Sequence, residues 1–287
     1  MNFQEKLEKG KFVITSEITP PKGTNVQSAL EVVNTLKNKI DAINVTDMAG
    51  GIMRLSSLCL SYLIKQKGGE PIFQITASHR NRLALQSDVL SASVLGIRNI
   101  LVLSGDPPSY GDQKEAKPVF DLDSIGILEM IRKMAEGYDL AERELQGSPQ
   151  FFCGAAVDPN AENLDFQISK MERKIRAGAR FFQTQPIFDI AKFAEFMKKT
   201  QRFNVPVLGG VIFLKNEKTA DYLNKNIPGI SIPGEIIKRL KTAIDKEKET
   251  VRIALELIKQ MHPLCQGVHL MPLGKNNLVE EVIERIF

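Results

Sequence analysis

Residues 99–108 read NILVLSGDPP, a run of branched apolar side chains that ends in a serine, a glycine, Asp106 and two prolines. A continuous apolar run of this length is typical of a strand buried on both faces, as in a parallel sheet. Gly105 allows the backbone to approach a ligand closely, and the two prolines stiffen the chain that follows. The stretch therefore predicts a buried parallel strand that presents a carboxylate at its carboxyl end.

Seven further stretches have the same composition of β-branched, aromatic and other apolar residues. They are FVITSEI (12–18), AINVTD (42–47), PIFQITA (71–77), FFCGAAVD (151–158), RFFQTQP (180–186), PVLGGVIF (206–213) and GVHLMPL (267–273). Segments with helical periodicity lie between them, at 28–38, 82–96, 166–178 and 190–200. Gly96 and Gly178 end two of these segments, as expected for a helix terminus that precedes a strand.

This alternation predicts parallel strands joined by right-handed crossovers. Eight such units in 287 residues predict an α/β fold, a (β/α)8 TIM barrel that forms a single catalytic domain over residues 1–287. A doubly wound fold is disfavoured because ITPPKGTN, after the first strand, is not the G-x-G-x-x-G fingerprint. The polar loop 107–121 and the helix-rich stretch 216–261, in which 238–261 has the pattern of a surface helix, are expected as additions to the barrel.

Composition narrows the class of protein. Hydrophobic residues make up 43% of the chain and charged residues 25%, which is typical of a globular protein with a large core. The net charge of +4 is spread without a basic block, so we expect no nucleic-acid partner. The chain has no signal peptide pattern and no run of eighteen apolar residues, which predicts a cytoplasmic protein without a membrane partner. Three scattered cysteines without CxxC spacing predict reduced thiols and no metal site.

In a barrel of this kind the active site forms at the carboxyl ends of the strands, where this sequence places several polar residues. Most aspartates and threonines there cap helices and turns, and that reading stays open for each of them. Glu17 is harder to explain as a turn residue, because it interrupts an apolar strand and glutamate is a poor strand former. A carboxyl group at the barrel mouth suits proton donation. Gln185 offers a donor and an acceptor from one amide, and Pro186 fixes the chain behind it.

Four motifs, SEITPPKGTN, INVTDMAGG, LSGDPP and RKIRAGARFFQTQPIFD, follow one another on successive predicted strands. Together they resemble the methylenetetrahydrofolate reductase family, in its short bacterial form and its acetogen-type or bifunctional-enzyme branch. The resemblance extends over nearly the whole chain. It implies an FAD-dependent oxidoreductase of one-carbon metabolism that reduces 5,10-methylenetetrahydrofolate to 5-methyltetrahydrofolate.

The resemblance also implies roles for individual residues. Glu17 would be the general acid that opens the imidazolidine ring of the folate to an iminium, Gln185 would bind the folate, and Asp106 would hold the pterin edge and tune the flavin. FAD-binding positions would be Thr46, Gln74, Leu103, Ser104, Gly105 and Asp106 around the isoalloxazine and ribityl chain, with Arg173 and Lys174 at the phosphates. The electron donor would be NADH, NADPH or a partner protein. We expect a homo-oligomer, with an electron-transfer subunit as a further partner.

Two other classes of function stay open at this point. A flavin-free transferase or lyase would bind a pterin or a phosphorylated substrate through Lys275, and a folate-binding subunit would act only within a complex. Glu17 argues against the second, because binding alone does not need an acid at the barrel mouth. The three histidines, His79, His262 and His269, are dispersed in the sequence, and we expect satisfied structural roles for them.

Overall fold

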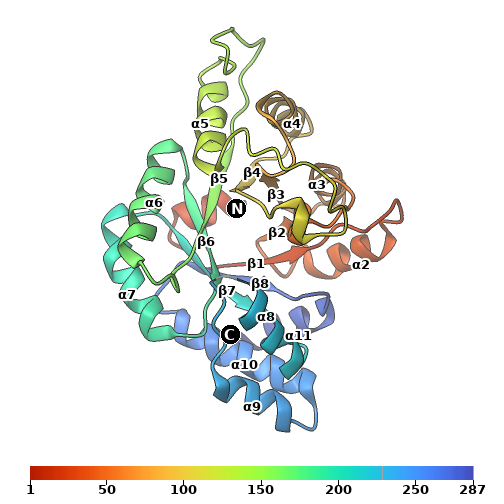
Figure 1. The fold of residues 1–287 in the computed structure, drawn as a ribbon, viewed down its shortest axis with the longest axis vertical. Helices are drawn as coiled ribbons and strands as arrows, with labels where there is room; N and C mark the ends of the chain where they lie inside the picture. The colour runs from red at the N-terminus through yellow and green to blue at the C-terminus, as the bar shows by residue number, and fades with distance from the viewer. Residues whose placement is uncertain (228, 287) are drawn as a thin grey trace.

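The structure, a computed structural model, describes residues 1–227 and 229–286, within which eight parallel strands close into a barrel in sequence order (Figure 1). The strands are β1 (Val13–Ile18), β2 (Ala42–Val45), β3 (Pro71–Thr76), β4 (Asn99–Leu103), β5 (Phe152–Val157), β6 (Phe181–Pro186), β7 (Val207–Ile212) and β8 (Gly267–Met271). Every one lies inside a stretch for which the sequence predicts a strand, and the predicted (β/α)8 barrel is confirmed.

The helices surround the strands on all sides (Figure 1). They are α1 (Phe3–Glu8), α2 (Gln27–Leu36), α3 (Ser57–Gln66), α4 (Arg82–Val94), α5 (Ser124–Ala135), α6 (Leu164–Ala177), α7 (Ile190–Thr200), α8 (Glu217–Asn226), α9 (Gly234–Thr242), α10 (Lys246–Met261) and α11 (Asn276–Ile286), with short 3₁₀ turns η1 (Ala49–Gly51), η2 (Pro108–Tyr110) and η3 (Gln201–Phe203). In the part of the chain that the structure describes, no helix is both long and apolar enough to span a membrane.

The extra helical content predicted between residues 216 and 261 is present as α8, α9 and α10, but the single surface helix predicted over 238–261 was wrong. Ala243 leaves the helical conformation, with φ −64° and ψ 131°. Asp245 then starts a new helix, because its side chain accepts a hydrogen bond from the backbone N–H of Lys248 (3.1 Å). The break allows α10 to bury a long apolar face against the barrel while α9 turns away from it.

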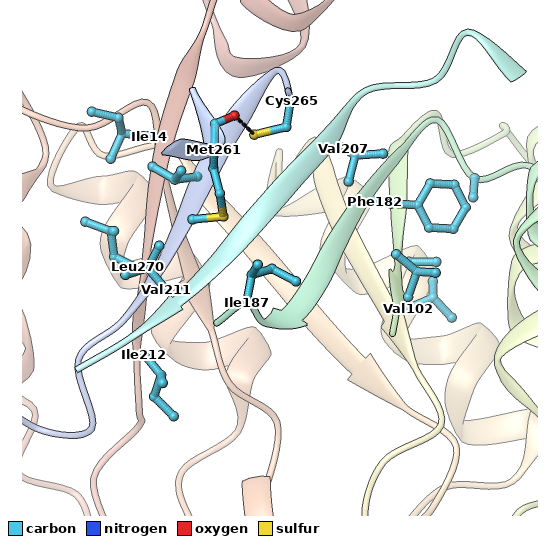
Figure 2. Close-up of a cluster of buried hydrophobic side chains, with 14 of the residues drawn as sticks. Ile14, Val102, Phe182, Ile187, Val207, Val211, Ile212, Met261, Cys265 and Leu270 are labelled. Atoms are coloured by element: carbon cyan, nitrogen blue, oxygen red, sulfur yellow. Dashed lines mark hydrogen bonds between the residues drawn. The ribbon is translucent and has the colours of Figure 1, made fainter. Parts of the chain in front are cut away.

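Most of the apolar core lies between the barrel wall and the surrounding helices. Figure 2 shows part of this layer, from Ile14 on β1 and Leu270 on β8 to Val102 on β4. The packing is close where α10 crosses β7, since a Cβ added to Gly209 would lie 2.7 Å from the sulfur of Met261. Cys265 is buried beside it, and its thiol donates a hydrogen bond to the carbonyl oxygen of Met261 (3.3 Å).

The inside of the barrel is divided into an apolar end and a polar end. At the amino end of the strands, Phe3 of α1 packs edge-on against Phe152 and Phe181, with ring centroids 6.0 Å and 5.3 Å away. These rings belong to a separate apolar cluster that closes this end. Because side chains two residues apart on a strand share a face, the positions after this apolar layer also point inward, toward the carboxyl end where the polar residues gather.

Candidate active site at the carboxyl ends of the strands

Glu17 lies on β1, beside Asn44 of β2 in the strand register. Its side chain is mostly buried, with 19% of its surface exposed, and one carboxylate oxygen lies 3.7 Å from Nε2 of His269 on β8. The sequence predicted a satisfied structural role for His269, with which its contact with Thr15 agrees, and the structure adds the approach of its other ring nitrogen to Glu17. The barrel brings β1 and β8 together as neighbours although Thr15 and His269, which face each other, are 254 residues apart in the chain, which no local pattern could reveal.

Gln185 lies where the register of β6 against β7 shifts, between Gln183 and Pro186. The irregularity is stabilised locally: the Thr184 hydroxyl donates to the Gln185 carbonyl oxygen (2.7 Å) and accepts from the backbone N–H of Gly210 (2.9 Å). Irregularities of this kind re-aim a side chain and often lie next to active sites. Gln185 is half-buried there, at the same end of the barrel as Glu17.

Asp106 follows β4 and is exposed, as is Ser104, while Leu103 is half-buried. One carboxylate oxygen of Asp106 accepts a hydrogen bond from the backbone N–H of Gly50 (2.8 Å) in the loop after β2. Gly105 has φ +79°, and a Cβ added there would overlap the Ser78 hydroxyl. Glycine is therefore required before this carboxylate by its dihedral angle and by the neighbouring Ser78 side chain, whereas the close approach to a ligand expected from the sequence stays a prediction.

A buried ion pair joins the ends of β2 and β3. The fully buried carboxylate of Asp47 accepts hydrogen bonds from both the N–H (3.0 Å) and the hydroxyl (2.8 Å) of Thr76, and it pairs with the Arg80 guanidinium (2.6 Å). Arg80 also contacts Asp88 of α4 (2.8 Å), and burial raises the pKa of Asp88. Asp47 therefore has a structural task, in line with the capping role that stayed open for aspartates at strand ends.

Three buried polar atoms gather at the same strand ends with no hydrogen-bond partner among the described residues. They are Oγ1 of Thr46, Oγ of Ser78 and Nε2 of His79. The sequence predicted a structural role for His79 in which its ring nitrogens are hydrogen-bonded, but its Nε2 has no partner among the described residues. Burial lowers the pKa of the His79 ring. Unpaired buried polar atoms are costly, so these atoms are candidates to bind a ligand or water, although Oγ of Ser61 on α3 is unpaired as well. Gln74, whose side chain shares the inward face of β3 with that of Thr76, is also buried.

Arg173 and Lys174 lie on α6 but differ in environment. Arg173 is exposed, whereas Lys174 is buried and its ammonium group donates a hydrogen bond to the carbonyl oxygen of Ala156 on β5 (2.7 Å). Burial lowers the pKa of Lys174 to about 8.

The family model for methylenetetrahydrofolate reductase matches residues 2–287, which is nearly the whole of this chain. The chain belongs to the methylenetetrahydrofolate reductase family.

Relatives in the methylenetetrahydrofolate reductase family include proteins of different length. Methylenetetrahydrofolate reductase 2 of Schizosaccharomyces pombe is 23% identical over 281 residues, which cover 90% of this chain and 41% of the yeast protein. The 5,10-methylenetetrahydrofolate reductase of Salmonella typhimurium is 24% identical over 268 residues, covering 88% of this chain and 82% of the bacterial protein. This chain therefore spans less than half of the yeast relative and most of the bacterial one.

Two solved structures resemble this chain over nearly its whole length. An uncharacterized protein from Clostridium thermocellum, described as binding two copies of 5-methyl-5,6,7,8-tetrahydrofolic acid, has a TM-score of 0.68 at 16% identity, with 98% of both chains covered. Oxaloacetate acetylhydrolase has a TM-score of 0.55 at 9% identity, with 99% of this chain and 83% of that chain covered. At such identities the likeness concerns the fold alone.

FAD is the cofactor that the methylenetetrahydrofolate reductase family implies, and the residues at the barrel mouth fit it. Isoalloxazine carries several hydrogen-bonding atoms on a flat ring, and the unpaired hydroxyl of Thr46 lies at a strand end that would face such a ring. Lys174, with its buried ammonium group, and the exposed Arg173 offer positive charge for a phosphate on the α6 side.

Sequence reasoning missed three polar residues inside this barrel: Asn44, Gln183 and His269. Each is buried, and each makes hydrogen bonds to another interior side chain. A signal for one was present, since Gln183 and Gln185 stand two residues apart on a strand and so share its inward face. The other two, Asn44 and His269, stand within apolar strands, and only closure of the barrel brings them to their partners Gln183 and Thr15.

Proposed function

We propose that this protein reduces 5,10-methylenetetrahydrofolate to 5-methyltetrahydrofolate, with FAD as the cofactor. The observation that carries the proposal is the placement of Glu17: a mostly buried carboxyl group on the inner wall of the barrel, in a chain that belongs to the methylenetetrahydrofolate reductase family. An acid at this place suits a substrate whose ring nitrogen must be protonated before its one-carbon unit can accept a hydride. FAD, when bound, would supply that hydride.

The proposed roles of the chain's own residues follow from where they lie. Glu17 donates a proton to the ring nitrogen that leaves the one-carbon unit. Gln185 binds the pterin through its amide, and Asp106 binds the donor groups of the pterin edge. Arg173 and Lys174 neutralise the cofactor's phosphates. Glu17, Gln185 and Asp106 come from β1, β6 and the loop after β4, so together they would fix the substrate face toward the cofactor and contribute to rate through orientation.

The proposal is tested by an anaerobic visible spectrum of the purified protein, loaded with FAD, while 5-methyltetrahydrofolate is added. We expect a flavin band that bleaches, because the folate product returns its hydride to the oxidised flavin. This half-reaction needs no electron donor, so it applies equally whether NADH, NADPH or a partner protein is the physiological donor. Glu17→Gln should retain the flavin band but bleach about a hundredfold more slowly, because in this reverse direction the Glu17 carboxylate accepts the proton from the ring nitrogen, and general acid–base catalysis contributes about this much.

Other results would overturn the proposal. A protein that stays colourless after FAD is added would favour the flavin-free transferase or lyase. A bound flavin that does not bleach in the wild-type protein would favour a folate-binding subunit. Bleaching of Glu17→Gln at the wild-type rate would remove Glu17 from its proposed role.

A further inference from the structure

Beneath Glu17, four polar side chains cross the interior of the barrel as one connected layer. Asn44 and Gln183 exchange two amide hydrogen bonds across the barrel (2.8 Å and 3.1 Å). Gln183 also donates to the hydroxyl of Thr15 (3.3 Å), and that hydroxyl lies 3.0 Å from Nδ1 of His269. The other ring nitrogen of His269 faces Glu17. The layer is therefore a continuous chain of contacts that ends at the proposed acid.

This layer is unusual for the interior of a barrel, which bulky branched apolar residues ordinarily fill. All four residues are at most 4% exposed, so each polar atom must be paired to avoid a desolvation cost. Apolar residues would fill the same space without that requirement. Packing alone does not explain why a histidine lies here, 3.7 Å from Glu17.

The contacts of His269 allow two arrangements of protons. If the Thr15 hydroxyl donates to Nδ1, the ring proton is on Nε2 and points toward an ionised Glu17. If Nδ1 instead donates to the hydroxyl, which can turn toward the carbonyl oxygen of Val268 (3.5 Å), Nε2 has a free lone pair that suits a protonated Glu17. The same ring therefore offers a matching partner to both forms of the carboxyl group.

We propose that His269 is the positioning residue for Glu17: it holds the carboxyl group at the barrel mouth in both of its protonation states, and Thr15 orients the ring. The inference rests on the proposed function of Glu17 as the acid. The distance of 3.7 Å is longer than a hydrogen bond, and contacts of this kind commonly shorten when substrate is bound. Among the residues that the structure describes, no lysine or arginine side chain forms an ion pair with Glu17.

One test needs neither flavin nor folate. Nitrogen-15 NMR of the cofactor-free protein reports the tautomer of each imidazole, and the chain has only three histidines. Glu17→Gln replaces a group that changes between acceptor and donor with a fixed amide. We expect the ring signals of His269 to move while those of His79 and His262 stay. Unchanged His269 signals would overturn the inference.

Variants of His269 then separate positioning from packing. A glutamine amide reaches about as far as Nε2, whereas an asparagine amide matches Nδ1 and reaches only Thr15. We expect His269→Asn to slow flavin bleaching by 5-methyltetrahydrofolate by roughly tenfold to a hundredfold, the usual cost of a misplaced catalytic group. His269→Gln should recover most of the rate, and KM and FAD binding should change little in both.

Equal losses in the two variants, or a parallel loss of FAD binding, would mean that His269 is structural only. The same measurements show separately whether the proposed function fails or the pairing of His269 with Glu17 fails. If the wild-type flavin does not bleach but the His269 signals respond to Glu17→Gln, the reductase assignment falls and the pairing of the two residues stands. If the flavin bleaches and the signals do not respond, the pairing falls and the assignment stands.

Discussion

At the scale of single residues, the buried charge of Lys174 destabilises the folded protein. It is only 7% exposed, its partner is a neutral carbonyl oxygen, and burial lowers its pKa from 10.5 to about 8. A lysine with a lowered pKa destabilises the folded state wherever it stays charged in the unfolded chain. An apolar residue would avoid this cost, so the presence of lysine here is consistent with the anionic cofactor that we propose.

The first prediction concerns Lys174→Met in the cofactor-free protein. Below about pH 8 the amine is charged in both states and the burial cost is complete. Between about pH 8 and 10.5 the unfolded chain binds more protons than the folded one, so the wild-type free energy of unfolding rises with pH relative to the variant. The advantage of the variant should therefore shrink by about 3 kcal/mol across this range, as measured by urea unfolding at several pH values. Lys198→Met, at an exposed position on α7, is the matched control for replacing a lysine that is not buried.

At the scale of elements, the long loop between β4 and α5 is fixed to its neighbours along its length. Asp112 forms an ion pair with Lys22 and accepts from the backbone N–H of Met53 (3.1 Å). Farther on, residues 119 and 120 donate backbone hydrogen bonds to residues 78 and 77 after β3 (3.0 Å and 3.2 Å). This polar segment was expected from its composition, but its attachment to three other loops depends on the closed barrel. The attachments hold Asp106 at the mouth.

The second prediction is that Gly105→Ala disturbs this loop. Its φ of +79° strains an alanine, and the added Cβ would overlap the Ser78 hydroxyl and lie 2.8 Å from Cβ of Thr76. Gly10→Ala is a matched control, since Gly10 has φ +66° with no atom within 4 Å of the added Cβ. We expect Gly105→Ala to lose roughly 2 kcal/mol more than the control in urea unfolding, because overpacking adds to the strain. Equal losses would show that the loop moves freely away from β3.

At the scale of the whole molecule, the two ends of the barrel have separate tasks. The amino end is closed by an apolar plug, in which the Phe152 and Phe181 rings stack 5.1 Å apart and Phe3 covers them. The carboxyl end carries the polar layer and the candidate active site. The residues of the plug therefore contribute to folding stability, whereas the residues at the carboxyl end form the candidate active site.

The third prediction tests this separation with Phe3→Ala. Removal of a fully buried phenylalanine should lower the free energy of unfolding by about 3–5 kcal/mol. The rate of flavin bleaching at 25 °C in the folded protein should stay within about twofold of wild type, because Phe3 packs at the amino end of the strands whereas Glu17 lies near the carboxyl end of β1. Phe166→Ala, at a position 61% exposed, serves as the stability control and should change little. A large loss of bleaching rate in Phe3→Ala would mean that the two ends are coupled.

Much of this protein was predictable from local patterns. The apolar runs predicted all eight strands, because a strand buried on both faces needs continuous apolar side chains and leaves that pattern in the sequence. Glu17 and Gln185 could be singled out for the opposite reason, as polar residues that such a strand does not need. The helical break at Ala243 was missed, since amphipathic periodicity continues across it and only the cap at Asp245 marks the new start.

The sequence by itself determined the parallel barrel and the end of it at which polar groups collect, because both follow from residue spacing along one strand or helix. Only the tertiary structure decided which of those groups meet. His269 reaches Glu17, and Asn44 reaches Gln183, through contacts between strands that are far apart in the chain. Such contacts depend on the closure and register of the barrel, and hydrogen-bond partners chosen across its interior leave no periodic signal in the sequence.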